Sequence, residues 1–88
     1  MDKKSFNVAA AGILGACASA GSLGAPGGVM YAGLMANGYT LQDFERITGA
    51  LAGAGLVLKR GECYTITPKG LELNAMIDAA LSQQRAAA

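Results

Sequence analysis

The chain has 88 residues, which fits a single domain over residues 1–88, and its hydrophobic fraction of 52% excludes a disordered tail. Its formal net charge is +1. Dedicated nucleic-acid binders usually have a clearer basic excess, so this charge lowers the expectation of DNA binding without excluding it.

The first segment, residues 1–20, has two interpretations. Lys3 and Lys4 precede an Ala/Gly-rich apolar run that ends in small residues, as in an export signal or a lipid-anchored leader. The same run places apolar residues at helical spacing, with Asp2 as a cap, and it holds few large aliphatic residues. We therefore favour a core helix over residues 6–20, and we expect no apolar run long enough to span a bilayer.

A glycine-rich connection and a short helix are predicted next. Residues 21–28 are dense in Gly and Pro and match neither a Walker loop nor a dinucleotide fingerprint, which indicates a flexible connection. Residues 28–37 are apolar and end in Asn37-Gly38, a pair typical of a helix C-terminus. The four residues from Asn37 to Thr40 are then a turn of the length that a helix-turn-helix requires.

Residues 40–55 carry the clearest helix signal. Thr40 is a good N-cap, and the carboxylate of Asp43 can accept hydrogen bonds from free N–H groups of the first turn. Apolar residues then recur at three- and four-residue steps until Gly55 ends the pattern. The predicted buried face is Phe44, Ile47, Leu51 and Ala54.

A β-hairpin and a last helix complete the chain. Residues 56–66 alternate with period two on both sides of Arg60-Gly61-Glu62, which indicates two strands joined by a glycine turn. Thr67 as a cap and Pro68 at the first helical position then predict a helix over residues 67–84. Residues 83–88 are expected to fray.

These features resemble the winged helix-turn-helix superfamily, which includes the MarR and PadR regulators. The recognition helix of that superfamily ends in an L-x-x-x-G-L-V/I step, matched here by residues 51–57. Its wing closes on Y-x-L/I-T-x-x-G, matched by residues 64–70. Over residues 6–80 the resemblance implies a mostly α fold with a small β-hairpin: a three-helix core, a two-stranded wing and a C-terminal helix.

The resemblance implies a small transcription regulator that binds double-stranded DNA. The outward face of helix 40–55 carries Gln and Arg, and these side chains suit adenine and guanine edges. Cations at the wing tip of such domains lie along the phosphate backbone. The candidate DNA-binding residues are Gln42, Arg46, Gly49, Lys59, Arg60 and Lys69.

A terminal helix of this kind builds a homodimer in MarR- and PadR-like proteins. One side of helix 67–84 is widely apolar, and a terminal helix with such a stripe needs a partner. The open alternative is a helix folded back onto its own domain. The candidates for contact with a second copy or a partner helix are Leu73, Met76, Ile77, Ala80 and Leu81.

Two features favour an alternative function, a winged-helix module that binds another protein and no DNA. On helix 40–55, Arg46 is outnumbered by Asp43 and Glu45, and a face of this charge is poor at meeting phosphates. Gly49 and Gly53 lie four residues apart and leave a smooth face, against which DNA, a partner helix or another part of this domain can pack closely.

Catalysis and metal binding have little support in the sequence. The chain has no histidine and no nucleophile beside a base, so we expect no enzyme activity, no catalytic residue and no cofactor. Cys17 and Cys63 form no CxxC, so we expect no metal site and two reduced thiols, as is usual in the cytoplasm. A membrane partner is not expected.

Overall fold

The computed structural model describes the backbone of residues 1–87 and the side chains of residues 1–83. The described chain is mostly helical with one small antiparallel sheet, which confirms the predicted mixture of helices and a small β element. Its elements are α1 (Lys3–Ala20), η1 (Gly21–Leu23), β1 (Ala25–Pro26), α2 (Gly27–Ala36), α3 (Leu41–Gly53), β2 (Val57–Arg60), β3 (Cys63–Ile66) and α4 (Pro68–Ala87).

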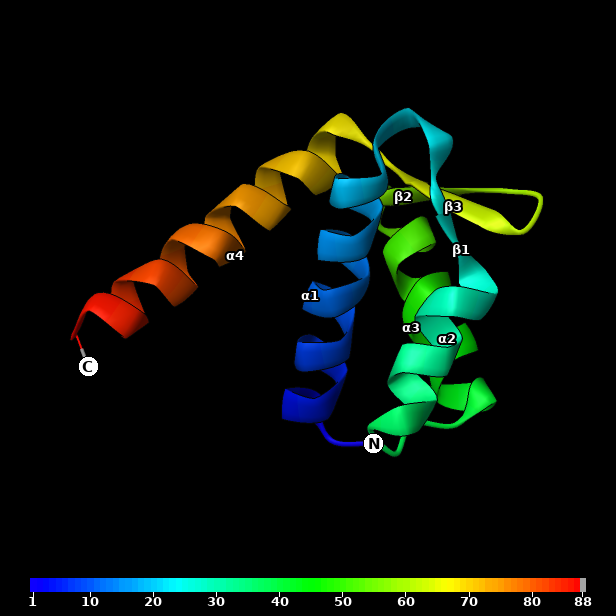
Figure 1. Ribbon diagram of the computed structural model, residues 1–88, viewed down its shortest axis with the longest axis horizontal. Helices are drawn as coiled ribbons and strands as arrows, with labels where there is room; N and C mark the ends of the chain where they lie inside the picture. The colour runs from blue at the N-terminus through cyan, green and yellow to red at the C-terminus, as the bar shows by residue number, and fades with distance from the viewer. Residues whose placement is uncertain (88) are drawn as a thin grey trace.

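The helices α1, α2 and α3 pack side by side, with the sheet at one end of the group (Figure 1). α4 begins at that end and leaves the group at an angle, so that its C-terminal half extends away from the other helices. The core lies between α1, α3 and the sheet, where burial of apolar side chains stabilises the fold. Its most deeply buried side chains are Ile13, Leu14, Cys17, Ile47 and Val57.

Helix α1 supplies one wall of this core. It begins at Lys3, because the side chain of Asp2 accepts a hydrogen bond of 2.7 Å from the N–H of Ser5 and caps the helix. The segment Lys3–Leu23 is long and apolar enough to cross a membrane, with a mean hydropathy of 1.5, which corrects our expectation that no run reaches that length. In the fold, five residues of α1 are buried in the core, including Cys17, and burial raises the pKa of the Cys17 thiol.

The glycine-rich connection contains a third strand, which corrects the prediction of a flexible segment and a two-stranded sheet. β1 pairs with β3, so the strand order is β1-β3-β2. A Cβ on Gly24 would lie 3.0 Å from the Cγ2 of Thr65, and one on Gly27 would lie 3.1 Å from the Cε2 of Tyr64. The glycines therefore let the segment approach β3 closely, and Gly24 also has a positive φ of 82°.

The predicted hairpin is present, with Gly61 in its turn at a φ of 61°. Val57 is buried, whereas the next residue, Leu58, is 50% exposed, so only one face of β2 meets the core. The bounds of the four helices α1 to α4 and of the hairpin lie within three residues of those expected. The two threonines Thr40 and Thr67 act as caps before the first helical residues, and α4 is helical up to Ala87, where we had expected fraying.

The start of α4 is fastened to the end of α3. The hydroxyl of Thr67 donates to the carbonyl oxygen of Gly55 (2.6 Å) and also accepts from the N–H of Gly70 (3.0 Å). The Nζ of Lys69 donates to the carbonyl oxygen of Ala54 (2.9 Å). These bonds use carbonyl groups that a helix leaves free at its C-terminus, so α4 starts from a fixed position even though its far end diverges.

Candidate nucleic-acid interface

Helix α3 is held at its N-terminus by a reciprocal capping box. The N–H of Asp43 donates to the Oγ1 of Thr40 (3.1 Å), and the N–H of Thr40 donates to the Oδ2 of Asp43 (3.0 Å). The hydrogen bond from the Thr40 N–H is the main reason why the pKa of the Asp43 carboxyl lies below its ordinary value. This end of α3 is therefore well defined, and the side chains that follow it start from a fixed helix.

One side of α3 is buried, which determines what the other side can present. Phe44, Ile47 and Leu51 lie in the core as predicted, whereas Ala54 is exposed. Thr48 is also buried, and its hydroxyl donates to the carbonyl oxygen of Phe44 at 2.9 Å, which satisfies its polar group inside the helix.

The exposed side of α3 carries Gln42, Arg46 and Gly49, as the sequence analysis expected for its outward face. A Cβ added at Gly49 or at Gly53 would meet nothing within 4 Å. Close packing within this domain therefore does not explain why glycine occupies these two positions. They form an open, nearly flat strip of helix surface.

The hairpin contributes two cations at its turn. Lys59 and Arg60 are the last residues of β2, opposite Tyr64 and Cys63, and both side chains are exposed. Figure 1 shows the hairpin projecting beyond the helices on the side away from α4. The cations therefore extend from the body of the molecule, where a long, charged partner can reach them.

A hollow of about 350 Å³ with both polar and apolar walls lies between the hairpin and the start of α2, and sequence reasoning did not anticipate it. Lys59, Glu62 and Gly28 are among the residues that line it. The N–H of Gly27 donates to the carbonyl oxygen of Glu62 (2.8 Å), and no side chain caps α2. The Pro26-Gly27-Gly28 sequence was the available signal, because it begins a helix with no residue that can serve as a side-chain cap.

The remaining predicted cations lie elsewhere. Lys69 belongs to the first turn of α4, and its amine donates to the Ala54 carbonyl at the C-terminal end of α3. It therefore helps to join α3 to α4. Lys3 and Lys4 begin α1 at the end of the molecule opposite the hairpin (Figure 1), so they do not extend the cationic surface of the hairpin. They lie instead near the turn before α3, because the hydroxyl of Tyr39 donates to the carbonyl oxygen of Ser5 (2.8 Å).

The predicted dimer residues of α4 divide into two groups. Leu73 and Ile77 are half-buried and pack against the core from the α1 side. Met76, Ala80 and Leu81 are exposed, with 68% of the Met76 side chain accessible. One face of α4, which carries Leu73 and Ile77, thus packs onto its own domain, and the face that carries Met76 and Ala80 is open to solvent.

No family model matches the chain, and neither a curated protein nor a solved structure matches it. Within residues 1–87, no three His, Cys, Asp or Glu side chains come together in a way that could hold a metal ion.

Proposed function

We propose that the chain is a small winged-helix domain that binds double-stranded DNA and regulates transcription. The observation that carries this proposal is the pairing of an exposed helix face on α3 with a cationic hairpin that is separated from α3 by three residues. The order α1-β1-α2-α3-β2-β3 and the strand order β1-β3-β2 support the winged-helix assignment.

In this proposal α3 lies in the major groove. Its exposed Gln42 and Arg46 have the hydrogen-bonding groups to contact adenine and guanine edges, and Gly49 lets the helix backbone approach closely. Lys59 and Arg60 follow the phosphate backbone and supply affinity that does not depend on sequence. The uncapped start of α2 beside Lys59 adds N–H groups that suit a phosphate oxygen.

The experiment is a mobility-shift assay against random duplex pools at two salt concentrations. We expect binding that weakens steeply as salt rises, because two or more phosphate contacts release counterions. Binding that is absent at low salt, or that does not change with salt, would contradict DNA recognition by this surface.

The protein-interaction function has its own supporting observation, the open strip at Gly49 and Gly53 beside the carboxylates of Asp43 and Glu45. A flat helix face with more carboxylates than cations fits a partner helix better than it fits phosphates. Gly53→Leu blocks such close approach, and Gly12→Leu makes the same change at an open position on α1. Purification from the native host would then recover a partner with Gly12→Leu and lose it with Gly53→Leu. If Gly53→Leu still recovers the partner at the level of the unchanged chain, this alternative is wrong.

We also propose that the domain acts in the cytoplasm as a homodimer joined through α4, with no enzymatic role. The exposed residues Met76 and Ala80, which lie four residues apart on one face of α4, support this arrangement, because a twofold axis would bury the same surface of both copies. A dimer would also present two α3 helices to two half-sites on one duplex.

A further inference from the structure

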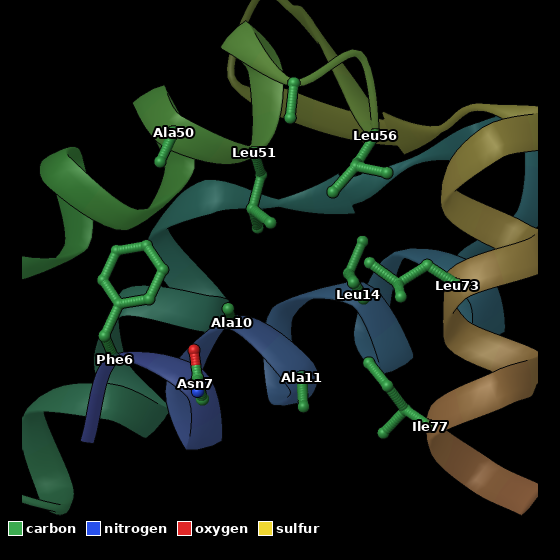
Figure 2. Close-up of a pocket in the computed structure, with 11 residues that line it drawn as sticks. Phe6, Asn7, Ala10, Ala11, Leu14, Ala50, Leu51, Leu56, Leu73 and Ile77 are labelled. Carbon is green, nitrogen blue, oxygen red and sulfur yellow. The ribbon is translucent and has the colours of Figure 1, made fainter. Parts of the chain in front are cut away.

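A cavity of about 510 Å³ lies between α1, α3 and α4, and neither of the two hairpin cations is part of its lining. Figure 2 shows side chains from all three helices, and Leu56 from the turn after α3, directed toward one common space. The volume falls in the range of small-molecule sites, which is about 300–1,000 Å³. The lining residues are Phe6, Asn7, Ala10, Ala11, Leu14, Ala50, Leu51, Ala54, Leu56, Leu73 and Ile77.

The cavity has a buried floor and an exposed rim. Leu14, Leu51 and Leu56 are buried at its base, whereas Ala50 and Ala54 are exposed at its edge. Because these rim residues are alanines and α4 diverges, the space that larger side chains would fill is left open. A molecule can therefore enter from solvent and reach apolar walls without any helix having to unfold.

The chemistry of the lining is almost uniform. Asn7 is the one polar side chain among the described residues that line the cavity, and Figure 2 places it on α1 at the edge of the space. Its amide offers both a hydrogen-bond donor and an acceptor. Within residues 1–83, no charged side chain is part of the lining, so a ligand charge would lose its hydration without gaining a partner.

From these observations we propose that the cavity binds a small, neutral aromatic or alicyclic molecule that has one hydrogen-bonding group at its edge. The rings lie against Leu14, Leu51 and Ile77, and the polar group meets the Asn7 amide. None of the candidate DNA-binding residues lines the cavity, so the proposal does not depend on whether the chain binds DNA.

The test uses two fluorescent dyes with the same ring skeleton. N-phenyl-1-naphthylamine is neutral, and 8-anilinonaphthalene-1-sulfonate differs from it by one sulfonate. We expect the neutral dye to bind with one molecule per chain and at least about tenfold more tightly than the anionic dye. Equal affinities, or many dye molecules per chain, would overturn the proposal, because both indicate adsorption to exposed apolar surface.

A matched pair of substitutions locates the site. Ala50→Leu fills the cavity from its rim, and Ala52→Leu makes the same change at an exposed position of α3 that does not line it. We expect Ala50→Leu to lower the affinity for the neutral dye by about tenfold or more and Ala52→Leu to leave that affinity unchanged. Circular dichroism verifies folding, and Ala54→Leu, also on the rim, replaces Ala50→Leu if that variant unfolds.

Unchanged dye affinity in the folded Ala50→Leu or Ala54→Leu variant would place the dye elsewhere and overturn the proposal. Dye release as the protein concentration rises into the range where dimers form would also overturn it, because a second copy then covers the cavity. A dye affinity that is independent of protein concentration supports the small-molecule site.

Discussion

Among the glycines of the described chain, Gly70 has the least room for a side chain. A Cβ at this position would collide with the carbonyl oxygen of Leu56 and would lie 2.7 Å from the Cγ1 of Ile66. The backbone of α4 passes this close because Thr67 fixes the first turn against the end of α3. In the sequence, Gly70 is only the last residue of the motif over residues 64–70. Its steric role depends on the packing of α4 against Leu56 and Ile66, which the sequence does not show.

We predict that Gly70→Ala destabilises the fold by about 2 kcal/mol or more, because the backbone cannot move away as a flexible side chain would. Gly49→Ala is the matched control, since its Cβ would point into open space in a helix interior. That change should stabilise the fold by about 0.5–1 kcal/mol. Urea unfolding of both variants measures the difference, and equal effects would contradict the packing described for Gly70.

Asp43 gives the stability of α3 a pH dependence. Its pKa is lowered in the folded chain, mainly by the Thr40 N–H, so its contribution is present above the unfolded-state pKa. The contribution is lost as the pH falls through the folded-state value. We predict that Asp43→Asn lowers the melting temperature at about pH 7 and has a much smaller effect at about pH 2.

Glu45→Gln is the control for this measurement, because Glu45 is an exposed carboxylate on the same helix outside the capping box. It should have little effect on melting at either pH. If Asp43→Asn lowers the melting temperature equally at both pH values, the carboxylate is not the group that caps α3.

At the scale of elements, the hairpin and α3 have separable roles in the proposed function. Replacing both Lys59 and Arg60 by Ala removes two phosphate contacts, so duplex affinity should fall for every sequence. The slope of log affinity against log salt should become shallower by about 2. Fluorescence polarisation at several salt concentrations measures both quantities.

The control variant replaces Lys3 and Lys4 by Ala, which removes the same charge at the opposite end of the molecule. It should leave most of the salt slope in place. A slope that falls equally in both double variants would mean that total charge, and not the hairpin, supplies the affinity.

Most helices and strands could be predicted from the sequence, because the residues that begin and end each one lie within a few positions of it. The capping box at Thr40 and the left-handed Gly55 and Gly61 are examples, and all three are present. β1 was missed because two residues carry too little pattern, and its partner β3 lies about 40 residues further along the chain.

Part of the candidate site could also be predicted from local sequence signals. Helical periodicity was enough to place Gln42, Arg46 and Gly49 on the exposed side of α3. The bond from Lys69 to the Ala54 carbonyl and the hollow beside α2 depend on how distant segments meet. No periodicity within one segment contains that information.

At the scale of the whole molecule, the exposed face of α4 that carries Met76 and Ala80 favours an oligomer. Met76 is 68% exposed on α4 and Val29 is 69% exposed on α2, so Met76→Glu and Val29→Glu are matched changes on different faces. We expect Met76→Glu to weaken self-association by about tenfold or more, because it would bury a charge in the interface. Val29→Glu should leave it unchanged. Sedimentation equilibrium measures both, and an equal response of the two variants would contradict dimerisation through α4.

The most direct measurement of the proposed function is a nuclear magnetic resonance titration of the chain with a duplex at low salt, which reports the backbone amides that respond. We predict the largest shifts at Gln42, Arg46 and Gly49 of α3 and at Lys59, Arg60 and Gly61 of the hairpin, with α4 nearly unaffected. Shifts confined to α1 and α4, or no shifts at any duplex concentration, would contradict the account of α3 and the hairpin as a DNA-binding surface.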